Sequence, residues 1–358
     1  MVEIYKAMGR KGFSERADAL AALGIDASRY YIGAPDGAVP KEFISGLDGV
    51  YISSPNSLHS RQAHDVLSSG TCAIVEKTLA TNRQEFDSLL EFAEERNAGG
   101  MLYLHLHYLH KQLTLQMEGL LRSAVERYGR AKSVSATFLE RYSEDERRRS
   151  WLFSMSEGGI FMDWIHPFEV LFYGAMAEEV RLADARSFIL DARYSKHEPS
   201  GVEALAGIRG RYFAAGAKAV IRVGKGSEAT VKRIRFYLDD GIAAEFDFRS
   251  SENEFGTEER GVFRIVDESN GASTLIGSFA PRGPDSSQIF ASEIAALLRG
   301  DNRGMSMAQI ARLFEPQWEY QKMLGTNGVV SDSAAVSAFV AAGMRNDPEA
   351  SGAWRSGD

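Results

Sequence analysis

The sequence predicts two domains: an α/β domain with a parallel sheet, followed by an α+β domain with a large open, mainly antiparallel sheet. In residues 1–110 short apolar strands alternate with helices, and this alternation is typical of a doubly wound parallel sheet. From about residue 112 long alternating strands follow one another with few helices between them. The length of 358 residues is that of two ordinary domains.

The elements of the first domain follow from their apolar patterns. Residues 2–8 form a short strand, and an Ala-rich helix at 14–23 follows it, with Ser14 as the expected N-cap. Strands at 29–32 and 50–52 enclose a turn of helix that begins at Pro40. The remaining elements are two helices at 61–69 and 83–96, the second capped by Thr81, and two strands at 72–75 and 101–107.

The second domain is predicted over residues 111–345, with 346–358 as a flexible tail. It opens with a helix at 113–128, a strand at 131–139 and an apolar helix at 158–175. Asp239-Asp240-Gly241 and Ser269-Asn270-Gly271 are typical of hairpin turns. Four long strands are expected at 180–193, 207–222, 231–248 and 261–280. Two closing helices at 286–299 and 306–324 are expected to pack on this antiparallel sheet.

Composition excludes several classes of protein. The apolar and charged fractions, 44% and 25%, are those of an ordinary globular protein. A net charge of −8 argues against nucleic acid or an anionic membrane as the main partner. The one cysteine, Cys72, lies in an apolar strand, which excludes a disulfide framework and a cysteine-based zinc site. Without a long apolar run or a signal peptide, a cytoplasmic location is expected.

Residues 49–80 form one βαβ unit with polar side chains at both strand ends. The first strand runs into a Ser-Pro-Asn turn at Ser54–Asn56, with His59 just beyond, and the second ends in Glu76-Lys77. Ligands bind at the carboxyl ends of strands in parallel sheets. The charged pair therefore favours a functional site, with Lys77 as its leading residue. His59 is equally well explained as a cap of the helix that starts near residue 60.

Three motifs in order, SPNSLH, EKTLA and GGIFMDWIHPFE, resemble the glucose–fructose oxidoreductase / inositol dehydrogenase / rhizopine-catabolism (Gfo/Idh/MocA) family. The resemblance covers roughly residues 1–345 and includes the change from a Rossmann-like layer to an antiparallel sheet. It implies an NAD(P)-dependent oxidoreductase acting on a sugar, cyclitol or related small polar metabolite. It also implies a homodimer or homotetramer assembled through the sheet of the second domain.

The resemblance also assigns roles to individual residues. Ser54, Pro55 and Asn56 match the turn beside the nicotinamide ribose, and Glu76 and Lys77 match a strand-end pair whose lysine touches substrate and cofactor. Asp163 and His166 match the acidic and histidine positions of the substrate-facing helix. Lys77, Asp163 and His166 are thus the catalytic candidates. The cofactor-binding candidates are Ser54, Pro55, Asn56, His59, Glu76 and Arg10.

The sequence departs from the family pattern in three places. Thr78 replaces a proline whose peptide bond is often cis, and this replacement is expected to relax the turn that directs Lys77. Asp163 and His166 are three residues apart rather than four, and both spacings keep the pair on one helix face.

The third departure is the Gly-rich phosphate loop, which has no counterpart here. Residues 2–8 match the family's second strand, so the first strand and its loop are missing from this alignment and the cofactor site is degenerate. An alternative alignment makes Gly9–Gly12 a shortened loop but leaves too few residues before Ser54.

Further polar residues are candidates for the pocket. In the segment YLHLHYLHK, His107 and Tyr108 are expected to line the substrate pocket, whereas His105 is a core histidine. No acidic or cysteine ligand completes a metal site there, so no metal is expected. Trp164 is expected beside the substrate. The basic cluster Lys6, Arg10 and Lys11 favours NADP over NAD, and a solvated charged turn is an equally good explanation.

Three functional hypotheses remain. The first is an oxidoreductase that uses NAD(P). The second is an enzyme that works without a cofactor and uses Lys77, Asp163 and His166 for proton transfer in an elimination, isomerisation or cyclisation. The third is a non-catalytic homologue, which the retained polar residues disfavour. A lysine beside other cationic groups is suited to act as a general base because its pKa is lowered, and His166 is the alternative base.

Overall fold

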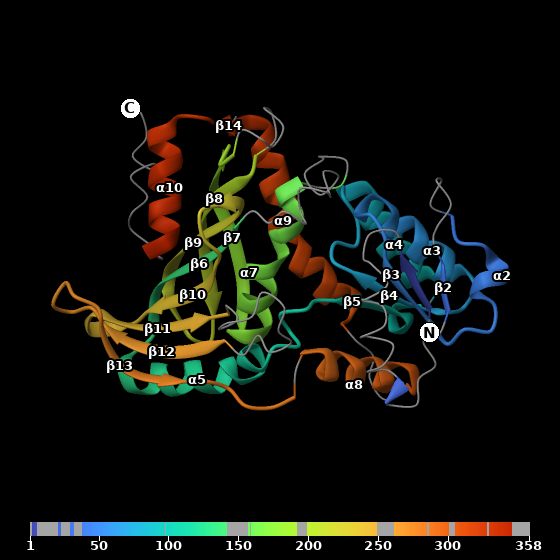
Figure 1. Ribbon diagram of the computed structural model, residues 1–358, viewed down its shortest axis with the longest axis horizontal. Helices are drawn as coiled ribbons and strands as arrows, with labels where there is room; N and C mark the ends of the chain where they lie inside the picture. Colours follow the sequence, from blue (N-terminus) through green and yellow to red (C-terminus); the bar gives the residue numbers. More distant parts are fainter. Residues whose placement is uncertain are drawn as a thin grey trace. The chain divides into compact units, whose positions relative to one another are not determined.

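The structure is a computed structural model that divides the chain into two compact units. Unit 1 comprises residues 1–110, 156–158 and 286–314, and unit 2 comprises 111–155, 159–285 and 315–358. The residues that the structure describes are 2–5, 21–22, 29–31, 38–96, 98–141, 157, 159–191, 199–248, 261–284, 286–300, 305–327 and 329–345. Figure 1 labels the helices and strands of both units.

Unit 1 contains a parallel sheet of five described strands in the order β2-β1-β3-β4-β5. The strands are β1 (Val2–Tyr5), β2 (Arg29–Tyr31), β3 (Gly49–Ser53), β4 (Cys72–Glu76) and β5 (Leu102–His105). The strand order reverses between β1 and β3, which makes this the topological switch point of the sheet. In doubly wound folds ligands bind outside the carboxyl ends of the strands at such a point.

Helices α3 (His59–Ser68) and α4 (Arg83–Glu95) pack beside each other, and α3 contacts β3 and β4. Helix α4 is capped by Asn82, whose side chain accepts a hydrogen bond of 2.9 Å from the Glu85 N–H, and not by the expected Thr81. A short helix α2 (Lys41–Ile44) and two 3₁₀ turns, η1 (Asn56–Leu58) and η2 (Gly99–Met101), complete this part. The predicted helix at 14–23 lies mostly outside the described residues.

Helix α8 (Ser286–Leu298) belongs to unit 1, although we expected it on the antiparallel sheet. Its apolar residues Phe290, Ile294 and Leu297 pack in one core cluster with side chains of β3, β4 and β5. Cys72 lies in that cluster, and burial raises the pKa of its thiol to about 12, as suits an inert core residue. The apolar face of a helix does not specify which sheet it covers, so sequence alone misplaced α8.

Unit 2 contains a nine-stranded mixed sheet in the order β13-β12-β11-β10-β6-β9-β8-β7-β14. The pairs β6–β9 and β7–β14 are parallel and the others antiparallel. Its longer strands are β6 (Ala131–Arg141), β7 (Ala177–Phe188), β8 (Gly201–Gly210) and β9 (Phe213–Ser227). The shorter strands are β10 (Val231–Tyr237), β11 (Ile242–Asp247), β12 (Val262–Asp267), β13 (Thr274–Phe279) and β14 (Val329–Val330).

The two predicted hairpin turns are confirmed, between β10 and β11 at Asp239–Gly241 and between β12 and β13. The strand predicted at 207–222 is wrong, because a turn at residues 211–212 divides it between β8 and β9. The single glycine before that turn was too weak a signal to break an otherwise continuous alternating pattern.

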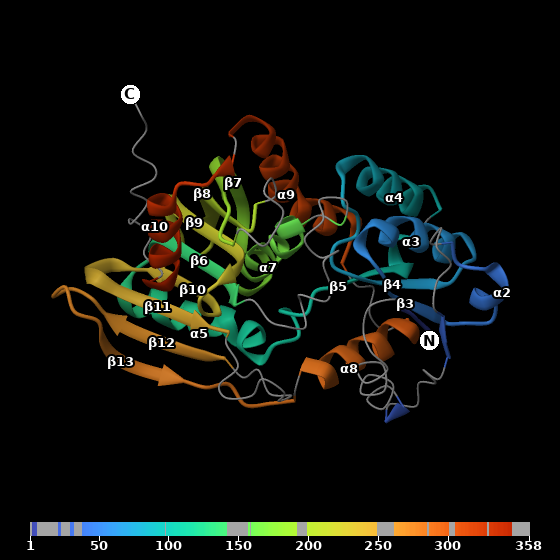
Figure 2. The same cartoon turned by 45° about the horizontal axis from the view of Figure 1, so that its top comes forward.

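Helices cover both faces of the unit 2 sheet. Helix α5 (Gln112–Tyr128) packs on β11 and β12, and α7 (Ile165–Glu169) packs on β6. Helix α10 (Ser333–Arg345) lies on the opposite face, where Phe339 stacks on Phe188 at 4.5 Å between ring centroids (Figures 1 and 2). Helix α9 (Met307–Asn327) begins in unit 1 and continues in unit 2.

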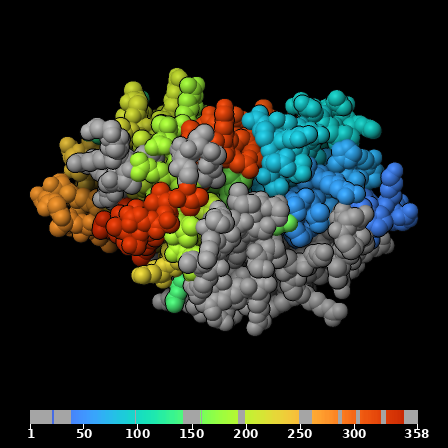
Figure 3. Space-filling view, turned by 90° about the horizontal axis from the view of Figure 1, so that it is seen from above, coloured from blue at the N-terminus to red at the C-terminus, as the bar shows by residue number. Residues whose placement is uncertain are grey.

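One edge of the unit 2 sheet, formed by strand β13, is exposed. All six residues of the edge strand β13 are exposed, including Leu275 at 57%, and the hairpin is visible at the rim of the space-filling view (Figure 3, orange). In the part of the chain that the structure describes, no helix has the length and apolarity needed to cross a membrane. A parallel sheet in one unit and a large, mainly antiparallel sheet in the other confirm the predicted fold class.

Candidate functional site

The polar turn after β3 is held by a carboxylate from a distant part of the sequence. The Asn56 side-chain amide donates to the Glu157 backbone carbonyl at 2.9 Å. The Ser57 hydroxyl and backbone N–H donate to the Glu157 carboxylate at 2.6 and 3.1 Å. Ser54 donates to Gln62 at 2.6 Å, and both Ser54 and Asn56 are buried. The turn predicted to bind the cofactor is therefore ordered by hydrogen bonds within unit 1.

His59 ties the two strand ends together. Its Nδ1 lies 2.7 Å from the Thr78 carbonyl oxygen and its Nε2 lies 2.8 Å from that of Ser54. The ring is 1% exposed, and burial lowers its pKa even though both carbonyls favour the charged form. A neutral imidazole has a single N–H, so it donates to one carbonyl only. His59 thus has a structural role, because it joins the chain segments that follow β3 and β4, and it is not a helix cap at the surface.

This geometry predicts a pH dependence of stability. Because the pKa of His59 is lower in the folded than in the unfolded state, the unfolded chain binds the proton first, and stability falls as the pH drops below about 6.5. Replacing His59 by Asn should cost about 1–3 kcal/mol at pH 8. This stability deficit should shrink towards pH 5. The wild type loses stability there because the buried His59 resists protonation, whereas the variant has no histidine at this position.

Thermal unfolding at several pH values, monitored by hydrogen exchange in unit 1, measures this difference in stability between the wild type and the variant. His64→Asn on the same helix is the control, since the His64 ring contacts Phe92 and Ser68 near the surface. A deficit of His59→Asn that grows on acidification would contradict the neutral, buried state of His59.

Lys77 follows β4 directly and is half-buried. The Lys77–Thr78 peptide bond is cis, although threonine stands here in place of proline, and the relaxation of this turn stays a prediction. Thr78 is fully buried, its carbonyl contacts His59, and its hydroxyl donates to the Ala80 carbonyl at 3.2 Å. Burial and hydrogen bonds at Thr78, rather than a proline ring, fix the backbone that carries Lys77.

The Glu76 side chain binds within the sheet. Its carboxylate accepts a short hydrogen bond from the Tyr51 hydroxyl and lies 2.9 Å from His105 Nδ1. The Tyr51 hydroxyl also lies 2.8 Å from His105 Nδ1, which makes the three side chains one cluster. His105 is 5% exposed, as expected for a core histidine. Glu76 therefore connects the ends of β3, β4 and β5, and its predicted contact with a cofactor stays a prediction.

The residues after β5 differ in how accessible they are. His107 is half-buried and its ring lies 4.4 Å from that of Tyr108, whereas Tyr108 is 1% exposed. His107 keeps surface through which it can contact a small molecule, and Tyr108 supports it from the interior.

The acidic and histidine candidates of unit 2 lie on consecutive turns of helix. Gly159–Asp163 is a 3₁₀ turn, Ile165–Glu169 is α-helical and Val170–Gly174 is a π-turn, in place of the single helix predicted at 158–175. Gly159 opens the segment with φ +53°, a conformation that favours glycine. The 3₁₀ turn contacts β9, α7 contacts β6, and the π-turn contacts β7 and α5.

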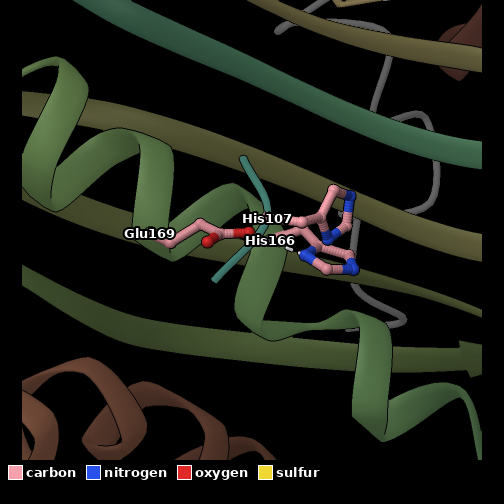
Figure 4. A group of neighbouring side chains, drawn as sticks. All are labelled: His107, His166 and Glu169. Atoms are coloured by element: carbon pink, nitrogen blue, oxygen red, sulfur yellow. Dashed lines mark hydrogen bonds and ion pairs between the residues drawn. The ribbon is translucent and has the colours of Figure 1, made fainter. Parts of the chain in front are cut away.

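His166 is held between two carboxylates of its own segment. Its Nδ1 lies 2.7 Å from Glu169 Oε1, and its Nε2 lies 3.8 Å from Asp163 Oδ1. Glu169 is fully buried, and His166 is 7% exposed. Figure 4 shows the His166 ring beside the Glu169 carboxylate on α7. The structure thus brings Asp163 and His166 together as the spacing predicted, and it adds Glu169.

Strand residues complete this cluster. The Lys225 ammonium on β9 lies 2.8 Å from Asp163 Oδ2 and 2.7 Å from Glu140 Oε2. Lys232 on β10 lies 2.8 Å from the other oxygen of Glu140. Burial opposes ionisation of Glu140, but the two ammonium groups outweigh it and hold its pKa well below the usual range.

A second lysine of unit 2 is buried near the same acids. Lys111, directly before α5, is 2% exposed, and burial together with Lys232 lowers its pKa to about 7, against the attraction of Glu169 and Glu140. An amine with this pKa is suited to proton transfer near neutral pH.

Trp164 differs from its prediction. It is fully buried, with its ring 4.6 Å from Tyr320 and 5.5 Å from Phe168. It has no surface left for a substrate, because its side chain fills the core beneath α7. The predicted cofactor residue Arg10, its neighbours Lys6 and Lys11, and the alternative loop Gly9–Gly12 lie outside the described residues.

Five charged residues of these clusters were not predicted from the sequence: Glu157, Glu169, Lys225, Glu140 and Lys111. Glu169 stands three residues after His166, and this helical spacing was a usable signal. The others lie far from their partners in sequence, so only strand register and packing bring them together.

Comparisons with known proteins agree with this fold. No protein-family model matches the chain. An uncharacterised oxidoreductase of Escherichia coli, YgjR, is 32% identical over 120 residues, which are 32% of this chain and 35% of that relative. The match thus spans about a third of the length of the relative.

Solved structures match nearly the whole chain at low identity. The aldose–aldose oxidoreductase of Caulobacter crescentus has a TM-score of 0.66 at 15% identity and covers 90% of this chain and 97% of its own. KijD10, a 3-ketoreductase of Actinomadura kijaniata in complex with NADP, has a TM-score of 0.64 at 16% identity, covering 92% and 98%. These neighbours are Gfo/Idh/MocA-type oxidoreductases, so the fold to which the three motifs pointed is confirmed.

Proposed function

We propose that this chain is an NAD(P)-dependent oxidoreductase acting on a sugar, a cyclitol or a related small polyol. The observation that carries the proposal is the arrangement of His166, whose Nδ1 is bound by the buried Glu169 while Nε2 lies on the side of Asp163. An imidazole whose one nitrogen is held by a carboxylate is oriented to accept a proton on the other. The fold shared with KijD10 and the aldose–aldose oxidoreductase supports this choice.

Oxidation of a hydroxyl to a carbonyl removes one proton and one hydride. A bound nicotinamide would supply the hydride acceptor. His166 Nε2 accepts the hydroxyl proton, Glu169 holds the ring and compensates its positive charge, and Asp163 accepts a hydrogen bond from a neighbouring substrate hydroxyl. Lys77 is the second candidate for proton transfer, on the backbone that the buried Thr78 fixes.

The described residues offer part of a dinucleotide site. The switch point between β1 and β3 is where doubly wound sheets bind nucleotides, and the polar turn from Ser54 follows β3 there. The part of the site that would hold the nicotinamide ribose would be lined by Ser54, Pro55, Asn56 and Glu76. NADP is preferred over NAD if Arg10 contributes its charge to a 2′-phosphate.

Titration of the purified 358-residue chain with NADPH and NADH, by fluorescence and calorimetry, tests the proposal. We expect binding in the micromolar range, tighter for NADPH. An absence of binding up to millimolar concentration of both would overturn NAD(P) use by this chain.

One observation favours a second candidate, an enzyme that transfers protons without a cofactor. Asn56 and Ser57, at the turn expected to contact the nicotinamide ribose, are bonded to Glu157 instead. Turnover that persists after removal of all dinucleotide would select this candidate.

Assembly into a homodimer or homotetramer through the unit 2 sheet stays a prediction. It is supported by the exposed apolar side chains of β13, Leu275 and Ile276, at 57% and 47%. An edge strand without charged residues or proline lacks the usual protection against pairing with another strand.

A further inference from the structure

The Lys225 side chain connects the helical segment to the sheet of unit 2. Lys225 lies near the end of β9, opposite Glu140 in the register with β6, and its backbone N–H donates to the Ser200 carbonyl at 2.7 Å. Lys225 is 8% exposed. A strand that is hydrogen-bonded on both sides holds the base of this side chain, so the position of the ammonium is set by the sheet.

The ammonium is placed between two carboxylates with different partners. It contacts Glu140 at 2.7 Å and Asp163 at 2.8 Å. Glu140 has a second cation, Lys232, at 2.8 Å. Among the ion pairs found in the described part of the chain, Lys225 is the lysine that reaches Asp163. Loss of Lys225 would therefore affect Asp163 more than Glu140.

The pairing has two consequences for Asp163. A cation at this distance favours the ionised form of a carboxyl group, so Asp163 accepts hydrogen bonds and does not supply protons. It also fixes Oδ2, which leaves Oδ1 as the oxygen on the side of His166, 3.8 Å from Nε2. Both the charge and the orientation of Asp163 thus depend on Lys225.

We propose that Lys225 is a positioning residue that keeps Asp163 ionised and directed towards His166, and that it thereby sets the protonation of His166. The proposal deepens the proposed function, and its test is designed to stand without it. Among the described residues of unit 2, Asp163 and Glu169 are the charged groups in contact with His166. The charged groups that surround these two acids are Lys225, Glu140 and Lys232 on the strands and Lys111 before α5.

The test follows the titration of the His166 ring by NMR in the ligand-free protein. The resonance is assigned among the seven histidines by its loss in His166→Gln. In Lys225→Met the Asp163 charge is no longer compensated, so the imidazolium is favoured and the titration midpoint should rise by about 0.5–1 pH unit. Lys225→Arg keeps the positive charge and should restore the midpoint to within about 0.3 unit of the wild type.

Lys232→Met is the matched control. It removes a cation from the same Glu140 but leaves the contact of Lys225 with Asp163 in place, and it should shift the midpoint by less than about 0.2 unit. If Lys225→Met does not fold, Lys225→Gln replaces it and should give a rise in the same direction. Equal shifts in the Lys225 and Lys232 variants, or no shift in either neutral Lys225 variant, would overturn the proposal.

Activity provides a second readout. If the oxidoreductase function holds, Lys225→Met should raise KM about tenfold, because Asp163 loses its fixed orientation towards the substrate hydroxyl, and Lys225→Arg should recover part of this loss. A shifted His166 titration in a protein without dinucleotide-dependent turnover would keep the role of Lys225 and reject the proposed function. An unshifted His166 titration together with normal dinucleotide-dependent turnover would reject the role of Lys225 and keep the proposed function.

Discussion

Replacing Lys77 by methionine is expected to reduce turnover by about 10²- to 10⁴-fold, the range in which a positioned general acid or base contributes to catalysis. Methionine keeps the length and apolar stem of the side chain but carries no proton. Because the buried Thr78 and its contact with His59 hold the turn, the variant should keep its fold. Dinucleotide affinity should change by only a few-fold, so the loss should appear in kcat.

Lys41→Met is the matched control for this prediction. Lys41 is an exposed lysine on α2 of the same unit, and its replacement should leave turnover within about twofold of the wild type, as is usual for surface changes away from a site. Steady-state and single-turnover kinetics with the best polyol substrate measure both variants. Lys77→Met with nearly normal kcat would remove Lys77 from the catalytic candidates and leave His166 as the base.

The second large effect is expected at a buried ion pair in unit 2. Arg222 Nε on β9 lies 2.7 Å from Glu203 Oε1 on β8, and the two side chains are 0% and 2% exposed. Arg222→Met leaves a carboxylate in the interior without its cation, which should cost about 3–5 kcal/mol of unfolding free energy. Because burial already raises the pKa of Glu203, protonation should relieve part of the deficit, which should therefore be smaller at pH 5 than at pH 8.

Tryptophan fluorescence during urea unfolding measures this effect in the right unit. Trp164 and Trp318 are buried in unit 2, and the sequence of unit 1 contains no tryptophan. Arg181→Met on β7 is the control, because its pair with Glu179 is exposed and should be worth less than about 1 kcal/mol. Equal costs for the two arginine variants would contradict the buried-pair account. A double variant, Arg222→Met with Glu203→Leu, should recover much of the lost stability.

Local patterns predicted much of unit 1. Apolar strands β3, β4 and β5 and amphipathic helices α3 and α4 lie close to their expected positions, because the periods of two and of about 3.6 residues are read from neighbouring residues. The same holds for the tight turn at Asp239–Gly241 and for the pairing of Asp163 with His166, three residues apart on one helical face. These features depend on chain segments of a few residues.

Packing decided the position of α8 and the role of Trp164. An apolar helix face buries itself on any surface of matching shape, and α8 packs on the parallel sheet through Phe290 and Ile294 rather than on the antiparallel one. An aromatic residue beside two functional side chains suggested a pocket, yet Trp164 turns into the core against Tyr320. Neither outcome is encoded in the pattern of the segment itself.

The sequence by itself determined the two-sheet fold class, the polar ends of β3 and β4, and the candidates Lys77, Asp163 and His166. Only the tertiary structure decided which charges surround them. Lys225 reaches Glu140 because β9 pairs with β6 in one register, and it reaches Asp163 because the 3₁₀ turn Gly159–Asp163 packs on β9. Glu157 reaches Ser57 across 100 residues of sequence. Strand order, register and burial are properties of the whole fold, and the free energy of an ion pair depends on the burial that the fold creates.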